Sequence, residues 1–183
     1  MPFEDVPAFV GKLRAKDSIS ARALEFLILT AARSGEVMGA VWSEVDLAKK
    51  VWTIPGPRMK AGKEHQVPLC PRALTILTEM AKLHTEDGEI VFHGGKLGQP
   101  LSTMAFGMLL RRMDLDVTAH GFRSSFRDWA GEKTNFPRDL AEQALAHAVG
   151  DDTERAYRRM QGLERRRKMM ADWAKFCGAG PAV

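Results

Sequence analysis

The first clear pattern along the chain is an apolar helix face. In the stretch SARALEFLILTAA, residues 20–32, apolar side chains recur at helical intervals, at Leu24, Leu27, Ile28 and Ala31. This spacing predicts a core helix, with Ser20 as its candidate N-cap. A second, short helix is predicted at GEVMGAVW, residues 35–42, with Ser34 as its cap. Arg33 then lies at the entrance of a helix N-terminus, a place that favours an anion.

Short runs of β-branched and aromatic residues replace the helical spacing between residues 41 and 69. The runs are VWSEVD, VWTIP and HQVPL, and turn-forming segments separate them. They predict a small antiparallel sheet of three strands. The loop between the last two strands carries three cations, Arg58, Lys60 and Lys63.

Helical patterns return after residue 70. PRALTILTEMAKLH and LSTMAFGMLLRRM predict two helices, residues 71–84 and 101–113. A third is predicted at TAHGFRSSFRDWAGE, where His120 and Arg123 lie one turn apart and can reach one target. Its inward stripe consists of Phe122, Phe126 and Trp129.

The last third of the chain is also predicted to be helical. Pro137 suits the first position of a helix that runs through RDLAEQALAH and ends near Gly150, with His147 in its last turn. A short helix over residues 151–160 bears Tyr157 after a loop, and a separate final helix covers residues 164–176. The apolar face of that final helix, which either packs on the chain's own core or docks on a neighbouring subunit, consists of Met169, Trp173 and Phe176.

Composition indicates one globular domain over residues 1–183, with a tail at 178–183 that is expected to fray. Hydrophobic residues make up 45% of the 183 and charged residues 27%, a balance typical of one well-buried core. The sequence has neither an apolar run of membrane-spanning length nor a signal-peptide pattern, so we expect a soluble, cytoplasmic protein without membrane contact. Cys70 and Cys177 suggest neither a disulfide framework nor a zinc site, and we predict no metal and no cofactor.

The positive charge is unevenly distributed. The first 90 residues hold 12 basic and 12 acidic residues, while the remainder holds 15 and 11 and carries the whole net charge of +4. Such a basic concentration either attracts phosphate polymers or keeps a helix solvated. Its densest part, within fourteen residues, is Arg155, Arg158, Arg159, Arg165, Arg166, Arg167 and Lys168.

Tyr157 is the single tyrosine in a chain with nine phenylalanines and four tryptophans. A side chain that only fills space could be phenylalanine, so a hydroxyl between Arg155 and Arg158 is a candidate nucleophile. A phenol becomes reactive at neutral pH when cations lower its pKa or a base takes its proton. Arginines and histidines elsewhere in the chain can provide both effects.

Two arginines can clamp the non-bridging oxygens of a phosphodiester. Arg33 and Arg123 are the candidates, and Glu36 can fix the guanidinium of Arg33. Each residue also has an ordinary interpretation: Arg33 as a surface ion pair, His147 as a helix cap, and Lys60 as a solvated lysine. Their order and spacing together favour the functional interpretation.

Four segments resemble the signatures of the tyrosine recombinase, or phage integrase, family, and among its members the integrases of prophages and genomic islands. They are TAARSGEV (30–37), MKAGKEHQVPL (59–69), TAHGFRSSFRDWA (118–130) and LAHAVGDDTERAYRRM (145–160). The resemblance implies an α+β, mainly helical catalytic domain with a small three-stranded antiparallel sheet, the fold of DNA breaking-rejoining enzymes. Two departures are Ala32, where glycine is frequent, and the pair Met160 and Gln161, where Ser-Asp is common.

The resemblance also implies a role for each site residue. Tyr157 would attack a DNA phosphate to give a 3′-phosphotyrosine link, while Arg33 and Arg123 neutralise the scissile phosphate. Lys60 would be the general acid for the departing 5′-oxygen, with Lys63 as the alternative. His120 and His147 would assist proton transfer and position the phosphate or the nucleophile. The residues expected to contact DNA around this site are Arg58, Lys63, Arg127 and Arg158.

The activity implied is site-specific recombination that integrates or excises a prophage or genomic island, without metal or ATP. The implied partners are double-stranded DNA, three further subunits in a synaptic homotetramer, and accessory DNA-bending proteins; the isolated domain would be a monomer. The core-binding and arm-binding domains that usually precede this domain are expected to be absent from the chain. The alternatives are a non-catalytic basic DNA-binding module or integrase remnant, and a type IB topoisomerase.

Overall fold

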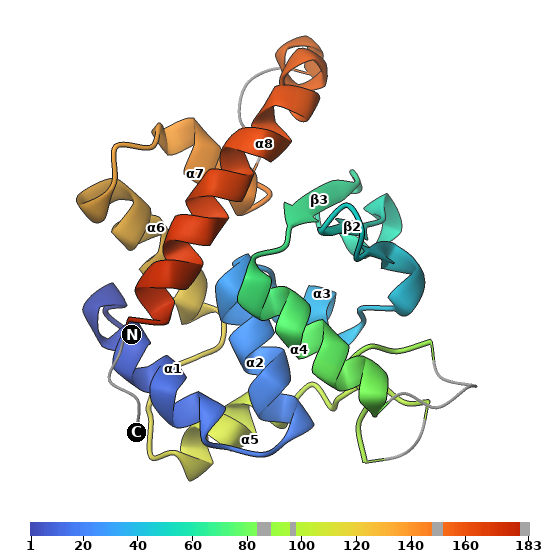
Figure 1. The fold of residues 1–183 in the computed structure, drawn as a ribbon, viewed down its shortest axis with the longest axis vertical. Helices are drawn as coiled ribbons and strands as arrows, with labels where there is room; N and C mark the ends of the chain where they lie inside the picture. The colour runs from blue at the N-terminus through green and yellow to red at the C-terminus, as the bar shows by residue number, and fades with distance from the viewer. Residues whose placement is uncertain (84–88, 96–97, 148–151, 180–183) are drawn as a thin grey trace.

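The computed structural model describes residues 1–83, 89–95, 98–147 and 152–179, and within 152–161 it describes the helical backbone without the side chains (Figure 1). The small sheet lies at one side of the helices, and α2 lies in the middle of the molecule. The elements are, in order, η1 (Phe3–Asp5), α1 (Val6–Arg14), α2 (Ile19–Thr30), α3 (Ser34–Met38), η2 (Trp42–Glu44), β1 (Val45–Asp46), β2 (Val51–Ile54), η3 (Gly56–Arg58), β3 (His65–Pro68), α4 (Pro71–Lys82), α5 (Ala105–Arg112), α6 (Gly121–Lys133), α7 (Arg138–Ala144) and α8 (Asp152–Cys177).

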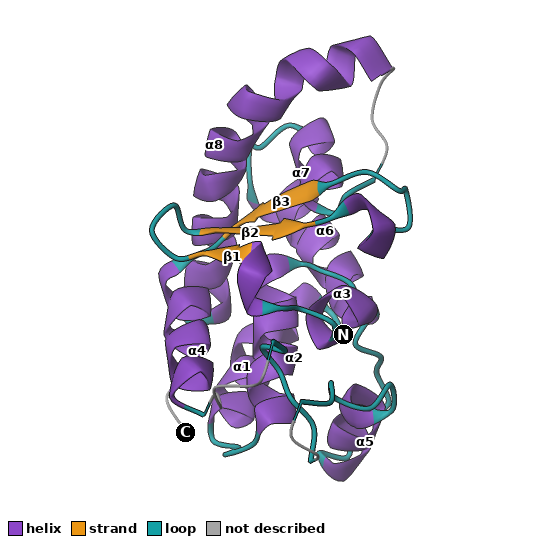
Figure 2. Ribbon diagram, turned by 90° about the vertical axis from the view of Figure 1, so that its right-hand side faces the viewer, coloured by secondary structure: helices purple, strands orange, loops and turns teal. Residues whose placement is uncertain are grey.

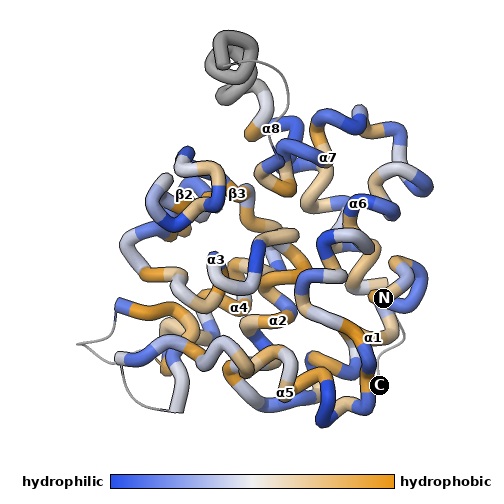
Figure 3. The backbone as a smooth tube through the Cα atoms, turned by 180° about the vertical axis from the view of Figure 1, so that it is seen from behind, coloured by the Kyte–Doolittle hydropathy of each residue, from blue (hydrophilic) through white to orange (hydrophobic). Residues whose placement is uncertain are grey.

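The central helix α2 confirms the predicted core helix. Every residue from Ala23 to Thr30 is buried, because α1, α4, α5, α6 and α8 all pack against it. Its N-cap is Ser18, whose hydroxyl accepts the Ala21 N–H at 3.2 Å, and not the predicted Ser20. In Figure 3 the hydrophobic colour gathers around α2, whereas the periphery is largely hydrophilic.

The sheet has the predicted three antiparallel strands, in the order β1-β2-β3 (Figure 2). Trp52 pairs with Val67 and Ile54 with His65, and the side chains of Trp52, Ile54 and Val67 are buried. The first strand is shorter than predicted because residues 42–44 form the turn η2. Glu44 in that turn accepts a hydrogen bond from the Trp52 indole at 3.0 Å, so this part of the run folds back on the sheet.

The C-terminal part of the chain forms one helix, α8, where two helices separated near Gly162 were predicted. A glycine inside a helix costs only about 1 kcal/mol, and here Arg166 Nε donates to the Gly162 carbonyl at 3.2 Å. In Figure 1 α8 crosses the near side of the molecule, and its C-terminal end lies beside α1. The prediction of a break near Gly162 is therefore wrong.

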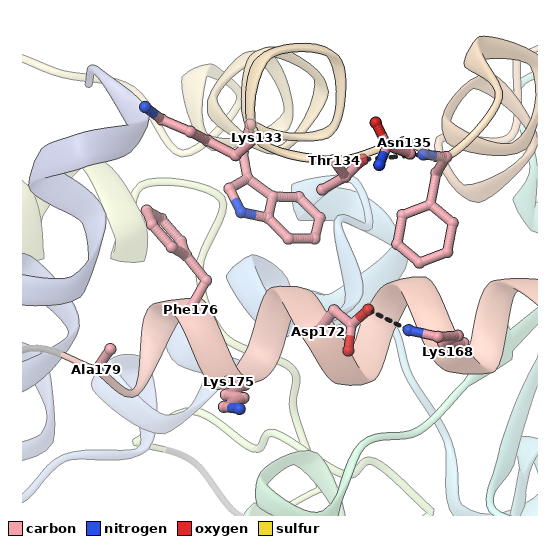
Figure 4. A pocket seen from close by; sticks show the side chains of 10 residues that line it. Lys133, Thr134, Asn135, Lys168, Asp172, Lys175, Phe176 and Ala179 are labelled. Carbon is pink, nitrogen blue, oxygen red and sulfur yellow. Dashed lines mark hydrogen bonds and ion pairs between the residues drawn. The ribbon is translucent and has the colours of Figure 1, made fainter.

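The apolar face of α8 packs on the chain's own core, which decides between the two predicted interpretations. Met169 and Trp173 are fully buried, and the Trp173 indole donates to the Ile28 carbonyl at 2.8 Å. Trp173 also contacts Trp129 of the predicted α6 stripe, with ring centroids 5.1 Å apart. Only Phe176 stays partly exposed, on one side of an open groove of about 740 Å³ between α8 and the end of α6 (Figure 4).

Other helices differ from the prediction in their limits or were not predicted. Helix α3 begins at Ser34, which was predicted to be its cap, and ends at Met38 instead of Trp42. Pro137 is the N-cap of α7 and not its first residue, and α7 ends at Ala144, because the chain turns back at Ala146 with a φ of 52°. Helix α5 starts four residues late because the Ser102 hydroxyl accepts the Met104 N–H in a preceding turn. Helix α1 has no counterpart in the predictions, although its buried residues Val6, Phe9, Val10 and Leu13 follow helical spacing. Within the described ranges, no helix is both long and apolar enough to cross a bilayer.

Candidate active site

Arg33 lies where the central helix ends and α3 begins. Helix α2 ends at Ala31, whose φ of 51° is in the left-handed region, and Arg33 is the N-cap residue of α3. The buried carboxylate of Glu36 accepts hydrogen bonds from the Arg33 backbone N–H at 2.7 Å and from its Nη1 at 2.8 Å. Glu36 therefore fixes the Arg33 guanidinium at a helix entrance, as the spacing of the two residues predicted.

Arg123 comes from the first turn of α6, on its buried face, and only 4% of it is exposed. Its guanidinium donates to the backbone carbonyls of Ala31 and Leu145. Burial, and then the positive charge of Arg33, lower the pKa of Arg123 to about 10. Arg123 still carries its charge at neutral pH, so a second cation lies within electrostatic range of Arg33.

Two neighbouring guanidinium groups repel each other, and burial of one of them strengthens that repulsion. The Glu36 carboxylate pairs with Arg33, but Arg123 donates to backbone carbonyls, which bind the donors without cancelling the charge. A phosphodiester supplies two anionic oxygens that match the forked donors of arginine. The arrangement of Arg33 and Arg123 is therefore suited to a phosphate.

His147 lies beyond the end of α7 and not in its last turn as predicted. Its backbone N–H returns to the Glu142 carbonyl, and its Nδ1 lies 2.6 Å from a Glu142 carboxylate oxygen. Its Nε2 is 3.3 Å from Arg123 Nη2. Since an arginine can only donate, Nε2 accepts the hydrogen bond from Arg123, and Nδ1 donates its N–H to the Glu142 carboxylate. The imidazole is thus oriented against the buried arginine.

Glu142 is a site residue that the sequence analysis did not identify. Burial tends to raise the pKa of its carboxyl, but the hydrogen bonds from His147 and Arg127 outweigh burial and lower it. Arg127, predicted to contact DNA, donates Nε–H to Glu142 at 2.6 Å. Its guanidinium therefore supports the carboxylate that orients His147. The sequence signal that could have identified Glu142 is its position five residues before His147.

His120 and Lys60 are both exposed. His120 directly precedes α6, and its carbonyl accepts the Arg123 N–H at 3.1 Å. Lys60 lies in the loop between β2 and β3, as predicted. For the residues that the structure describes, no recorded contact joins the side chain of Lys60 or His120 to the two arginines.

Arg58 in the same loop has a structural place that the sequence did not indicate. Its guanidinium binds the Glu44 carboxylate and the Glu36 backbone carbonyl, so it fastens the loop between β2 and β3 to α3. Arg58 thus holds this loop in place, and its DNA contact stays a prediction. Lys63 is exposed in the same loop and remains a predicted DNA contact. Tyr157 and Arg158 belong to the backbone of α8, but their side chains lie outside the described residues.

His65, the first residue of β3, is a second unpredicted group close to the arginines. The nearby backbone of Ala144 opposes a larger downward shift of the His65 pKa. Burial and then the charges of Arg166, Arg123 and Arg33 lower that pKa to about 3. His65 is therefore neutral at every pH near 7, and it lies among three arginines from three different elements.

Comparison with known proteins agrees with this geometry. The sequence model described as "Phage integrase family" matches residues 1–163. Prophage integrase IntA of Escherichia coli K12 is 37% identical over 181 residues, which cover 96% of this chain and 43% of that protein. The chain thus spans less than half of IntA's length.

Two solved structures share the fold. XerA recombinase aligns with a TM-score of 0.61 at 16% identity, over 86% of this chain and 62% of that one. XerH site-specific recombinase, in a pre-cleavage complex with its difH substrate, aligns with a TM-score of 0.62 at 16% identity, over 87% of this chain and 52% of that one. The predicted mainly helical recombinase fold is thereby confirmed. From the family match over most of its length, the chain belongs to the phage integrase family.

Proposed function

We propose that residues 1–183 form the catalytic domain of a site-specific DNA recombinase that cuts and rejoins strands through Tyr157. The observation that carries the proposal is the pair of guanidiniums from Arg33 and Arg123, held by Glu36 and by backbone carbonyls within electrostatic range of each other. Such a preorganised cationic pair stabilises the charge that develops on a phosphate in the transition state.

In the proposed cleavage step, the Tyr157 oxygen attacks the phosphorus and gives up its proton to a base. The bond between phosphorus and the 5′-oxygen breaks, leaving a 3′-phosphotyrosine and a strand with a 5′-hydroxyl. A 5′-hydroxyl that attacks the phosphotyrosine reverses the step and releases Tyr157. The bond energy is conserved in the covalent link, so rejoining requires no nucleotide hydrolysis.

The remaining residues take roles that suit their positions. Lys60, exposed on the loop between β2 and β3, protonates the departing 5′-oxygen, and His120 assists proton transfer at the nucleophile. His147 donates toward Glu142 and accepts from Arg123, so it sets the orientation of the arginine that binds the phosphate. Lys63 and Arg158 contribute to DNA binding.

The proposed setting is a bacterial cytoplasm, where the protein integrates or excises a prophage or genomic island. Its substrate is double-stranded DNA, and four subunits assemble around two attachment sites with the help of DNA-bending proteins. The DNA-bound state of XerH supports a DNA partner.

A nicked suicide duplex tests the proposal. The duplex is taken from the junctions of the element that carries the gene, and its nick releases a short fragment after cleavage, which prevents rejoining. We expect a protein–DNA adduct on a denaturing gel from the unaltered chain and none from Tyr157→Phe. Arg33→Ala should slow adduct formation on the order of 100-fold, whereas Arg111→Ala, an exposed arginine on α5, should leave it unchanged.

Two results would contradict the proposal. If the unaltered chain binds the duplex but forms no adduct, the chain is a DNA-binding module without catalysis. If it relaxes supercoiled plasmid without strand exchange between sites, the topoisomerase alternative is correct.

A further inference from the structure

Arg166 of α8 is buried and binds two backbone carbonyls. Only 7% of the residue is exposed. Its Nε donates to the Gly162 carbonyl of its own helix at 3.2 Å, and its Nη1 donates to the Gln66 carbonyl of β3 at 2.6 Å. Arg166 thus attaches α8 to the sheet at β3, and Figure 1 shows the two elements side by side.

The Gln66 carbonyl lies on the open edge of the sheet, because β3 is an edge strand. The Leu69 N–H donates to the Lys50 carbonyl, and hydrogen-bonded pairs alternate with non-hydrogen-bonded pairs along an antiparallel ladder. Counted from Lys50 and Leu69, the pair of Thr53 and Gln66 is a non-hydrogen-bonded one. The Gln66 carbonyl therefore points away from β2 and has no strand partner. Arg166 supplies the missing donor.

Arg167, the next residue of α8, binds a second part of the sheet. Its Nη1 and Nη2 donate to the carbonyls of Lys50 and Lys49 at 3.1 and 2.9 Å, in the turn between β1 and β2. We call Arg166 and Arg167 the sheet clamp. Two consecutive residues of one helix thus hold both the edge strand and the turn that precedes β2.

Stability alone does not account for the guanidinium of Arg166. Burial lowers its pKa to about 10, so Arg166 is charged at neutral pH. The acceptors recorded for it among the described residues are carbonyls, and an apolar side chain of similar size often leaves a fold as stable as a buried charge does. A guanidinium differs from such a side chain in its rigid fork of donors, which fixes direction.

The sheet clamp joins the two elements that carry reacting groups in the proposed function. Helix α8 bears Tyr157 nine residues before Arg166. The loop with Lys60 leads into β3, where Gln66 follows six residues later. In phosphoryl transfer the attacking and the leaving oxygen lie roughly in line on opposite sides of the phosphorus. The nucleophile and its general acid therefore need a fixed separation.

We propose that Arg166 is a positioning residue, which holds the Tyr157 segment of α8 at a fixed distance from the β2–β3 loop and its Lys60. The hydrogen bond to the Gln66 carbonyl fixes this distance, and Arg167 supports it. The inference rests on the proposed function, because it takes Tyr157 as the nucleophile and Lys60 as the general acid. Arg166 itself contacts neither the DNA nor a reacting oxygen.

Cleavage of the suicide duplex at saturating DNA tests the role of Arg166. Arg166→Met removes the donors and keeps a long, unbranched side chain in the buried position. We expect adduct formation to slow by at least about tenfold, since a displacement of about 1 Å can cost about 100-fold. Arg166→Lys keeps the charge and a donor, so it should recover part of the rate. The control Arg165→Met loses the same charge from an exposed position and should react normally.

A distance measurement tests the positioning itself. Spin labels on Tyr157→Cys and Lys63→Cys report the separation of the α8 segment from the loop, and the buried Cys70 and Cys177 stay unlabelled in the folded chain. By double electron–electron resonance we expect a broader distance distribution with Arg166→Met than with Arg165→Met. Equal distributions would overturn the inference even if the rate had fallen, because Arg166 would then have a structural role only.

The two measurements also tell failure of this inference from failure of the proposed function. If the unaltered chain forms no adduct, the proposed chemistry is wrong, and the distance distributions still show whether Arg166 holds the two elements. If the unaltered chain, Arg166→Met and Arg165→Met form the adduct at equal rates, this inference alone fails. Urea unfolding checks that Arg166→Met is folded; if it is not, Arg166→Lys replaces it in both measurements, with the same direction of change expected.

Discussion

Acidification from pH 7 to pH 5 should destabilise the folded chain through His65. Burial and three arginines lower its pKa in the folded state to about 3, whereas the unfolded ring titrates near 6.5. Between these two pKa values, His65 is therefore protonated in the unfolded chain and neutral in the folded chain. The free energy of unfolding falls as the pH falls through this window, and the loss levels off near pH 3.

The magnitude follows from the width of that window. Each pH unit between the two pKa values changes the free energy of unfolding by about 1.4 kcal/mol. From pH 6.5 to pH 5 the loss is therefore at most about 2 kcal/mol, a large part of the roughly 5–15 kcal/mol that stabilises a typical domain. The pKa values of Glu79 and Glu142 are lowered, so both carboxyl groups stay largely ionised at pH 5 and add little to this loss.

Urea unfolding at pH 7 and pH 5 measures this loss in the unaltered chain and in His65→Gln. The variant lacks the titrating ring but keeps an N–H donor, and all other histidines are common to both proteins. We expect the unaltered chain to lose about 2 kcal/mol more than His65→Gln between the two pH values. Equal losses would refute the assignment of a buried, neutral His65. A smaller loss in the unaltered chain would mean that folding raises the pKa of His65 instead of lowering it.

Three further predictions concern other parts of the molecule. In Gly56→Ala the new Cβ would lie 2.6 Å from the Gly62 carbonyl oxygen, so we expect adduct formation to slow about tenfold. The control Gly107→Ala places its Cβ in open space and should cleave at the normal rate. Equal rates in the two variants would contradict the reasoning. Glu25→Ala removes a buried carboxylate that binds Arg72 through both oxygens and should lower the free energy of unfolding by about 3 kcal/mol; a urea midpoint equal to that of the unaltered chain would count against it. DNA binding by the isolated chain should be weak and should fall steeply with added salt in a titration, whereas an affinity insensitive to salt would refute a phosphate-based contact.

Local patterns predicted the elements whose environment is regular. The apolar spacing of Leu24, Leu27 and Ile28 identified α2, and the stripe ending at Trp129 identified the buried face of α6. These predictions succeeded because burial on one helix face repeats with the helix period. The short sheet was likewise visible in its β-branched runs.

Such patterns could not predict contacts between residues that lie far apart in the sequence. The hydrogen bond of Arg123 to the Ala31 carbonyl joins positions 92 residues apart in sequence, and no local spacing predicts it. Arg58 was expected to meet DNA because it occupies a basic loop, yet Glu44 and a carbonyl of α3 bind it. Separate helices were predicted over residues 151–160 and 164–176, yet they form the single helix α8, which Arg166 anchors to β3. In each case tertiary contacts decide what the residue does.

Because α8 is one continuous helix, a small change of its angle at one end displaces its other end by a larger distance. Trp173, fixed in the core by its bond to the Ile28 carbonyl, lies 16 positions after Tyr157 on the same helix, which corresponds to about 24 Å at the helical rise per residue. A tilt of about 5° at that root would displace the backbone at Tyr157 by about 2 Å, which is enough to misplace a nucleophile. Substitutions in the aromatic core, far from any DNA, can therefore alter the cleavage rate through the angle of this one helix.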